Sequence, residues 1–281
     1  MSDQEQASIP SAPQGGNLRF PLQLPSQGLP YGGTLPDGNV EIAPLTTREE
    51  MIIAGFRESG GSDMALLIDS ILKTRVTFPN GFIYDDLLVT DRFFLIANVR
   101  AISFGEDYGF PWRCLCTPKA QQARCKMPGD LKLFKLAEGF HEPFEVKLPN
   151  CGKTLGLRLL RISDERAVDT YRRQVMERAT DMTLGDPGYL FKMARRVVTI
   201  DGVEANIEQK LQFLGDMLSA DSIEMQKGYE ENESGLSLQI EVKCRNCGQE
   251  REITLPFSAE FFRPDAPGGG SQAAVPAKHF E

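Results

Sequence analysis

The chain has 281 residues, of which 41% are apolar and 25% charged, enough to bury a core across one large or two small domains. Its apolar runs stay short of the roughly 18 residues of a membrane span, and its polar N-terminus lacks the apolar stretch of a secretory signal, so we expect a protein made in a cytoplasm, with no membrane partner. The net charge of −8 at pH 7 disfavours nonspecific adhesion to nucleic acid.

Residues 1–40 are rich in proline, glycine, serine and glutamine, a composition that cannot bury enough surface to offset the entropy of ordering. We therefore predict a flexible or extended N-terminal arm here. Within it, Leu24, Leu29 and Tyr31 lie in an apolar stretch that suits either docking on a partner or a solvated linker.

A helical lobe is predicted for residues 41–104. Thr47 and Glu50 have the spacing of a capping box, which predicts a helix from residue 47 to about 57. After a break at two glycines, Ser62 can cap a second helix with one apolar face. A third helix is predicted after Asp91.

A small antiparallel β region is predicted for residues 105–162. Strands are expected at 108–116, 131–136, 144–148 and 155–162. Phe144, Val146 and Leu148 alternate with charged residues, as in a sheet with one solvated face.

Residues 163–232 are predicted to form a helical insertion. Acidic residues after Ser163 suit a helix N-terminus, and Asp186-Pro187-Gly188 predicts a turn before a short helix at 189–196. A long helix is expected from about 205 to 230. Its apolar stripe predicts a core-facing side and contains Ile207, Leu211, Leu214 and Leu218.

The last ordered element is predicted to be a hairpin within residues 233–264, followed by a disordered tail at 265–281. Apolar residues alternate with polar ones before Cys244 and again after Gly248, which predicts two strands joined by a C-x-x-C-G turn. Phe261 and Phe262, beside the tail, suit either a buried position or presentation to a partner.

Two pairs of cysteines suggest one metal site. Six cysteines are too few for a disulfide scaffold, and in a reducing compartment C-x-x-C is more often metal-binding or redox-active. The turn from Cys244 to Cys247 makes half of a tetrahedral zinc site, and Cys114 and Cys116 lie on one side of a predicted strand. Loop closure over the intervening 128 residues costs little relative to the roughly 10 kcal/mol of structural zinc. The hypothesis is a zinc ribbon split by a long insertion.

Other kinds of function find less support. The sequence contains no paired histidines, P-loop or nucleophile elbow, so we expect neither an enzyme nor a small-molecule substrate. Arg113, Lys119, Arg124 and Lys126 form a basic run beside Trp112, which is the argument for a zinc-ribbon nucleic-acid binder. The simpler interpretation puts Trp112 in the core and the basic loop against an acidic protein. A thiol redox function of Cys244 and Cys247 is a further alternative.

Several phrases, none specific alone, occur together in an order that resembles the tailed-bacteriophage baseplate family typified by T-even phage baseplate hub assembly proteins. They span roughly residues 20 to 265. The phrases are Leu24-Pro-Ser-Gln-Gly-Leu-Pro-Tyr31, Val40-Glu-Ile-Ala-Pro-Leu-Thr-Thr-Arg-Glu-Glu50, Asp91-Arg-Phe-Phe-Leu-Ile-Ala-Asn-Val-Arg100, Glu142-Pro-Phe-Glu-Val-Lys-Leu-Pro149, Gly152-Lys-Thr154, Leu157-Arg-Leu-Leu160, Thr199-Ile-Asp-Gly202, the C-x-x-C-G turn and Phe261-Phe-Arg-Pro264.

The resemblance implies a non-enzymatic structural or assembly role in the hub of a phage tail baseplate. Other tail and hub proteins would be the partners, and the protein would be assembled in the bacterial host cytoplasm. The resemblance also implies that two cysteine pairs hold structural zinc. Here the first pair has one residue fewer between its cysteines than expected, so Cys116 and Cys125 compete to be the fourth ligand beside Cys114, Cys244 and Cys247.

The predicted fold class is α+β. It combines a helical N-terminal lobe, a small antiparallel β region with a split zinc ribbon, and a helical insertion. The predicted docking segments contain Leu24, Leu29 and Tyr31 at one end of the chain and Phe261 and Phe262 at the other.

Overall fold

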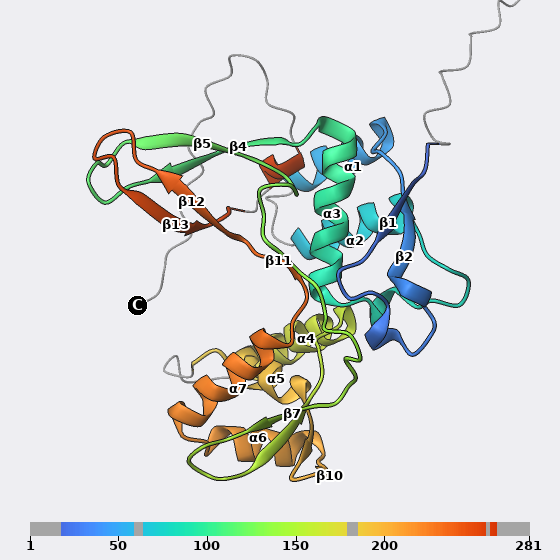
Figure 1. Ribbon diagram of the computed structural model, residues 1–281, viewed down its shortest axis with the longest axis vertical. Coiled ribbons are helices and arrows are strands. Elements are labelled where there is room, and N and C mark those ends of the chain that lie inside the picture. The colour runs from blue at the N-terminus through green and yellow to red at the C-terminus, as the bar shows by residue number, and fades with distance from the viewer. Residues whose placement is uncertain (1–17, 59–63, 179–184, 257–258, 263–281) are drawn as a thin grey trace, which may run out of the picture.

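The fold has three parts, shown by a computed structural model that describes residues 18–58, 64–178, 185–256 and 259–262. Figure 1 shows an N-terminal lobe around α3, an inserted lobe below it, and an arm of two hairpins that projects from the N-terminal lobe. The mixture of helices and small antiparallel sheets confirms the predicted α+β class. The predicted Ser62 cap and the predicted tail at 265–281 lie outside the described residues.

The N-terminal lobe contains a three-stranded antiparallel sheet with the order β1-β2-β3, flanked by helices. Phe20 lies opposite Ile42, and Ile42 lies opposite Val76 on the other side. Its elements are β1 (Phe20–Gln23), the 3-10 helices η2 (Leu29–Tyr31) and η3 (Pro36–Gly38), β2 (Asn39–Ile42), α1 (Thr47–Glu58), α2 (Met64–Arg75), β3 (Val76–Thr77), η4 (Tyr84–Asp86) and α3 (Val89–Phe104).

Residues 18–40 differ from the predicted flexible arm, because their glycines and prolines make tight turns within the lobe. Gly28 has a φ of 78°, and a Cβ there would lie 2.2 Å from the carbonyl oxygen of Leu35. Only glycine fits such a close backbone approach. The turns bury Leu24, Tyr31 and Leu35, so this segment is part of the core.

Helix α1 begins where the sequence predicted, but its cap lies one residue earlier. The Glu49 carboxylate accepts hydrogen bonds from the backbone N–H of Thr46 at 2.9 Å and from its hydroxyl at 2.8 Å. Arg75 at the end of α2 also donates to Glu49, at 2.6 Å. The predicted pair of Thr47 and Glu50 is therefore corrected to Thr46 and Glu49, because the half-buried Arg75 fixes the position of the buried Glu49.

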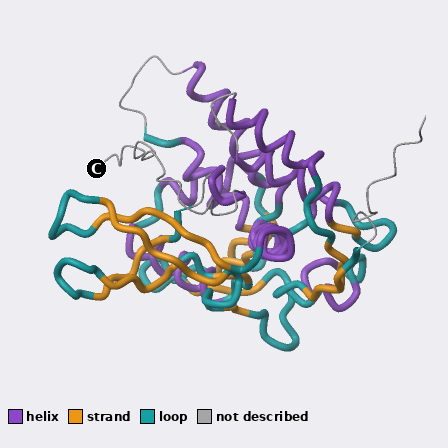
Figure 2. Tube along the Cα trace, turned by 90° about the horizontal axis from the view of Figure 1, so that it is seen from above, coloured by secondary structure: helices purple, strands orange, loops and turns teal. Residues whose placement is uncertain are grey.

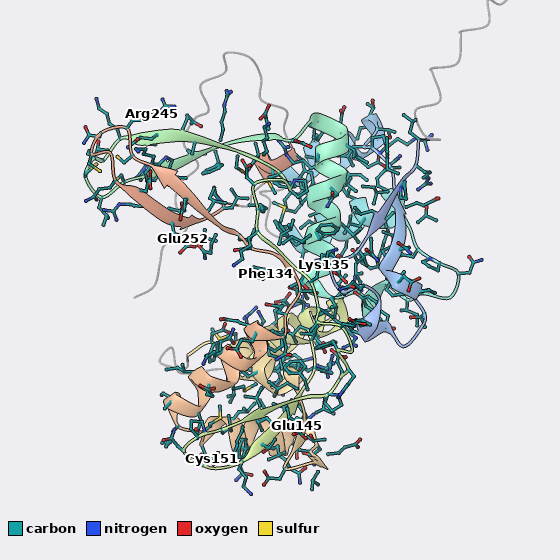
Figure 3. The ribbon with its side chains drawn as sticks, in the orientation of Figure 1. Phe134, Lys135, Glu145, Cys151, Arg245 and Glu252 are labelled. Atoms are coloured by element: carbon teal, nitrogen blue, oxygen red, sulfur yellow. The ribbon has the colours of Figure 1, made fainter. Side chains whose placement is uncertain are left out.

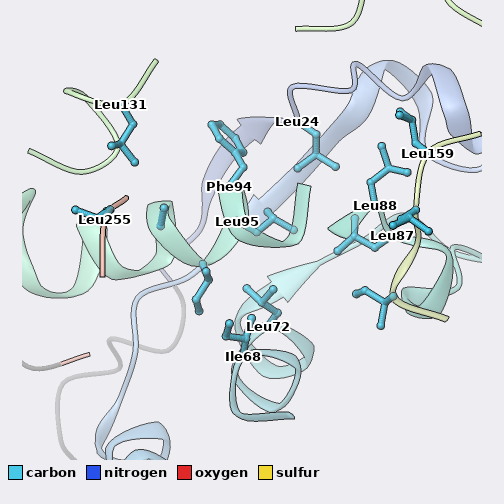
Figure 4. Close-up of a cluster of buried hydrophobic side chains, with 14 of the residues drawn as sticks. Leu24, Ile68, Leu72, Leu87, Leu88, Phe94, Leu95, Leu131, Leu159 and Leu255 are labelled. Atoms are coloured by element: carbon cyan, nitrogen blue, oxygen red, sulfur yellow. The ribbon is translucent and has the colours of Figure 1, made fainter. Parts of the chain in front are cut away.

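The core of the lobe is arranged around α3, which is buried along most of its length. Figure 4 shows Leu24, Leu72 and Leu88 near Leu95, with Leu131 and Leu255 near the other end of the helix. One continuous cluster of buried side chains thus joins residues that are far apart in the sequence. No helix among the residues that the structure describes has the length and hydropathy needed to cross a bilayer.

The inserted lobe contains a four-stranded antiparallel sheet with the order β10-β9-β8-β7, covered by helices. Because β8 pairs with β9, strands β7 and β8 belong to this lobe and not to the predicted β region at 105–162. The elements are β7 (Phe144–Lys147), β8 (Thr154–Leu157), α4 (Ile162–Arg178), α5 (Pro187–Arg196), β9 (Val197–Ile200), β10 (Val203–Glu204), α6 (Ile207–Gly215) and α7 (Ser219–Glu231).

The long helix predicted at 205–230 is two helices, α6 and α7, separated at residues 216–218. Helix α6 ends at Gly215, and Leu218 has an extended backbone with a ψ of 144° before α7 begins. The buried Asp221 carboxylate accepts hydrogen bonds from the backbone N–H groups of Asn150 and Cys151 at 2.8 and 3.1 Å. These bonds fix the start of α7 at the β7–β8 turn. Of the predicted stripe, Leu214 is buried, but Leu218 is exposed.

The arm consists of two hairpins that are distant in sequence. Strands β4 (Asp107–Arg113) and β5 (Ala120–Lys126) form one, and β12 (Gln239–Lys243) and β13 (Glu250–Thr254) form the other. Figure 2 shows their loops at the same end of the arm. A short pair, β6 (Leu133–Phe134) with β11 (Gly235–Leu236), lies where the chain passes between the two lobes.

Arg100 anchors the root of the arm. From α3 its buried guanidinium donates hydrogen bonds to the carbonyl oxygens of Gly105 and Asp107, both at 2.7 Å, and of Phe261, at 3.0 Å. Phe261 lies in the last described element, η5 (Ala259–Phe262). One side chain therefore joins the start of β4, the end of α3 and the chain that follows the second hairpin.

Candidate metal centre

Four cysteines meet at the tip of the arm. Cys114 and Cys116 follow β4, and Cys244 and Cys247 lie in the turn between β12 and β13. In that turn the backbone N–H of Gly248 donates to the carbonyl oxygen of Cys244 at 2.8 Å, and Gly248 has a φ of 72°. The turn thus reverses the chain while keeping both of its thiols on the side facing the other hairpin.

The four sulfur atoms lie within 4.8 Å of one another. Cys114 Sγ is 3.9 Å from Cys247 Sγ, and Cys116 Sγ is 3.5 Å from Cys244 Sγ. Four thiolates around a tetrahedral zinc ion, with Zn–S bonds of about 2.3 Å, lie roughly 3.8 Å from each other. The arrangement has the size and the donor atoms of a single tetrahedral metal site, and all four predicted ligands take part in it.

Amide groups hydrogen-bond to the sulfur atoms. Gln121 Nε2 on β5 donates to Cys244 Sγ at 3.1 Å, and Gln121 Oε1 accepts from the backbone N–H of Arg245 at 2.8 Å. Asn246 donates to Cys244 Sγ through its backbone N–H and to Cys116 Sγ through its side chain, both at 3.4 Å. Such bonds orient ligands around a metal and stabilise their negative charge.

The surroundings shift the pKa values of three of these thiols in different directions. The backbone of Cys247, with Gln121, lowers the pKa of Cys244 to about 5, and the backbone of Cys116 lowers the pKa of Cys114. For Cys116 the Asn246 amide lowers the pKa, but desolvation and the neighbouring thiols outweigh it and raise the value to about 12. The site therefore provides thiolate charge, and a divalent cation would favour ionisation of the remaining thiols.

The two other cysteines lie outside this cluster. Cys125 is buried in β5 opposite Tyr108, and burial raises the pKa of its thiol to about 11. The prediction of Cys125 as the alternative fourth ligand is therefore corrected. The register of β5 places this cysteine at the root of the arm, away from the cluster at the tip. Cys151 is exposed in the β7–β8 turn.

The predicted docking residues are mostly inside the molecule. Leu24, Tyr31, Phe261 and Phe262 are buried, whereas Leu29 is 39% exposed. The prediction that these residues contact a partner is therefore corrected for the four buried ones. Their apolar surface is already packed on α3 or on the root of the arm.

Trp112 and the residues of the basic run differ in burial. Trp112 is buried, so it is in the core and its ring is not available to stack on a base. Arg113, Lys119, Arg124 and Lys126 are exposed on the first hairpin.

Sequence reasoning missed Gln121 and Asn246. Asn246 lies between the two ligands of the C-x-x-C turn, a position from which it could have been inferred. Gln121 carries no such signal, because its contact depends on how two hairpins more than 120 residues apart stack on each other.

Comparisons with known proteins gave one match. The model of a family described as T4 bacteriophage base plate protein matches residues 29–263. No curated protein and no solved structure matches the chain.

Proposed function

The chain belongs to the T4 bacteriophage base plate protein family, and from this premise we propose that it is a non-enzymatic structural or assembly component of the baseplate hub, with a zinc-stabilised arm. The match covers the inserted lobe, the N-terminal lobe from residue 29 onward and all four clustered cysteines. Other tail and hub proteins are the proposed partners. The proposed location is the virion tail baseplate, after assembly in the cytoplasm of the bacterial host.

The observation that carries the zinc proposal is the construction of the arm. Its two sheets have two strands each, and backbone hydrogen bonds join the strands within each hairpin. An isolated two-stranded hairpin is marginally stable in water. The hairpins pack through the inner side chains Phe110, Trp112, Ile240 and Val242, and the four cysteines join them at the tip.

A metal ion at the tip would complement the anchor at the root. Arg100 fixes the root through three carbonyl groups, and a bound ion would fix the other end, so both ends of each hairpin would be held. Four thiolates in a tetrahedral arrangement select zinc or iron–sulfur chemistry, and sulfur separations of 3.5 and 3.9 Å fit a single ion. We infer zinc on that basis.

The proposed role of the ion is mechanical. Structural zinc contributes roughly 10 kcal/mol or more to folding, which exceeds the cost of closing the long loop between the two cysteine pairs. An arm that is already rigid loses less conformational entropy when it binds a neighbouring tail protein. The ion would thus lower the cost of assembly without taking part in a reaction.

Native mass spectrometry of the purified full chain tests this proposal. We expect one zinc ion per chain, released by a chelator, and four additional reactive thiols after release. Cys244→Ser should lose the ion, whereas Cys151→Ser, which changes an exposed cysteine outside the cluster, should retain it. A folded, metal-free protein with a Cys244–Cys247 disulfide would contradict the proposal and support a redox function.

A further inference from the structure

The outer faces of the arm differ in charge. In an antiparallel pair, residues directly opposite each other point to the same side of the sheet. Trp112 opposite Gln121 and Val242 opposite Arg251 are on the inner sides, where Gln121 contacts the other hairpin. The residues between them therefore form two outer faces, one on each hairpin.

The outer face of the first hairpin is basic. Arg113, Arg124 and Lys126 are exposed on it, and Lys119 is exposed in the loop at its end. Asp107, opposite Lys126 at the root, is the only acidic residue of β4 and β5. Arg113 and Arg124 have no ion-pair partner among the described residues, so this part of the face has an unneutralised positive charge.

The outer face of the second hairpin is acidic. Glu241 lies directly opposite Glu252, and both are exposed. Lys243, on the same face, is paired with Glu250 at 3.2 Å. Among the described residues, neither Glu241 nor Glu252 takes part in an ion pair. Figure 3 shows Glu252 on the lower side of the arm, below β13. Like charges in directly opposite cross-strand positions are destabilising, so these two acids disfavour the isolated hairpin.

We propose that the arms of adjacent copies of this chain bind each other, the basic β4–β5 face of one copy on the acidic β12–β13 face of the next. Glu241 and Glu252 have Cβ atoms about 5 Å apart by the geometry of such a pair, a spacing that lets one guanidinium contact both carboxylates. Arg124 lies next to the central residue of β5, and Glu241 is the central residue of β12. We assign these three residues to the centre of the contact.

The second copy is the partner favoured by charge complementarity. Both complementary faces belong to the same arm and lie on its opposite sides, so each copy can bind one neighbour on each side. Such contacts between different faces are heterologous, and they produce rings or open chains of copies. The net charge of −8 opposes contact elsewhere on the surface and thereby favours this one orientation.

The contact is expected to be weak in the isolated protein. The five-residue strands of the acidic face are about 17 Å long, so the area covered is below the roughly 800 Å² per partner of stable interfaces. The contact should also weaken with salt, because its charges are exposed. This inference goes beyond the proposed hub role and depends on the strand register rather than on the identity of the metal.

A charge-swap experiment tests the contact. Sedimentation velocity of the full chain at about 100 μM should show association at low ionic strength and its loss near 1 M salt, where the Debye length is about 3 Å. The variant Glu241→Lys/Glu252→Lys has two basic faces, and Arg113→Glu/Arg124→Glu has two acidic faces. Each variant alone should associate at least about tenfold more weakly, and an equimolar mixture should recover association, because the faces are again complementary.

Glu177→Lys/Glu231→Lys provides the matched control for the Glu241→Lys/Glu252→Lys variant, since it makes the same change in net charge at exposed positions outside the arm. Its association should equal or exceed that of the wild type. Native mass spectrometry of each variant measures its zinc content, so a damaged arm or a failed metal site is distinguishable from a failed contact.

A wild-type chain that stays monomeric at low salt would overturn the proposal, and so would a mixture that does not recover association. If Arg113→Glu/Arg124→Glu loses salt-dependent nucleic-acid binding while its self-association is unchanged, the proposal is wrong and the basic face binds nucleic acid instead.

Discussion

Asp91 is a fully buried carboxylate that fastens residues 18–40 to α3. The hydroxyl of Tyr31 donates to it at 2.6 Å and the backbone N–H of Ser26 at 3.3 Å. Burial raises the pKa of Asp91 to about 6, although the hydrogen bonds from Ser26 and Tyr31 lower it. The free energy of desolvating this carboxylate therefore exceeds the stabilisation that its two hydrogen bonds provide.

The stability of the protein should depend on pH through this group. The pKa rises from 3.8 in the unfolded chain to about 6 in the folded chain, so the folded state binds the proton more tightly. The contribution of Asp91 is greatest below pH 3.8, declines as pH rises, and above pH 6 is a cost of about 3 kcal/mol. The advantage of Asp91→Asn over the wild type in free energy of unfolding should therefore grow by that amount between pH 4 and pH 7. Urea unfolding measures it, and a pH-independent difference would contradict this.

At the scale of residues, the cysteine pairs were predictable because their spacing is local. The choice between Cys116 and Cys125 was not, because it depends on where β5 ends and how its register meets β4. The burial of Leu24 and Tyr31 was also not predictable from the sequence. A disordered arm and a series of tight turns are both rich in glycine and proline, so composition does not distinguish them. The close backbone contact at Gly28, which the sequence does not show, does.

At the scale of elements, α7 packs closely on β7 through Gly228. A Cβ at this position would lie 2.6 Å from Cγ2 of Val146. In most helices glycine costs about 1 kcal/mol relative to alanine, and its replacement stabilises. At Gly228 the added methyl group would collide with Val146, so we expect replacement by alanine to destabilise the protein.

Gly228→Ala should lower the free energy of unfolding by about 1–3 kcal/mol, because the added methyl group moves α7 or Val146. Gly215→Ala is the matched control, since its Cβ would meet Leu190 at an ordinary 3.8 Å. Urea unfolding of both variants measures the effect. Equal stability of the two variants would show that α7 is not held this closely.

Element types were largely predictable from periodicity, and element boundaries less so. The predicted hairpin around the C-x-x-C turn matches β12 and β13, and most predicted helices occur. The break between α6 and α7 was missed, because apolar spacing continues through it. Its cause is the buried Asp221, whose partners lie about 70 residues earlier in the chain.

At the scale of the whole molecule, α4 connects the two lobes. Arg166 on α4 donates to Asp69 on α2 at 2.9 Å and to Asp85 in η4 at 2.6 Å. Asp69 is buried, and Tyr84 also donates to it, at 2.8 Å. These contacts make a polar junction whose partners come from both lobes.

Arg166→Ala should destabilise the protein by about 1–2 kcal/mol, because it removes a charged donor from a buried carboxylate. Arg172→Ala removes a comparable pair that is more exposed, with Asp169 and Asp186, and should cost no more than about 0.5 kcal/mol. Thermal unfolding compares the two variants. Equal small effects would mean that Arg92, at 3.5 Å from Asp69, suffices to neutralise it.

The division into lobes was only partly predictable. An insertion between two halves of a ribbon was predictable from the spacing of the cysteines alone. The assignment of β7 and β8 was wrong because their sheet partner β9 lies about 40 residues further along the chain. Sequence alternation identifies a strand but not the strand it pairs with.

The measurement that tests the central claim most directly is hydrogen exchange of the full chain, followed by mass spectrometry, before and after removal of metal. If an ion at Cys114, Cys116, Cys244 and Cys247 holds the arm, its removal should reduce protection in β4, β5, β12 and β13 by at least about tenfold while α3 and β7–β9 keep theirs. Unchanged exchange in the arm after chelation would contradict the account, because the hairpins would then be stable without a metal ion.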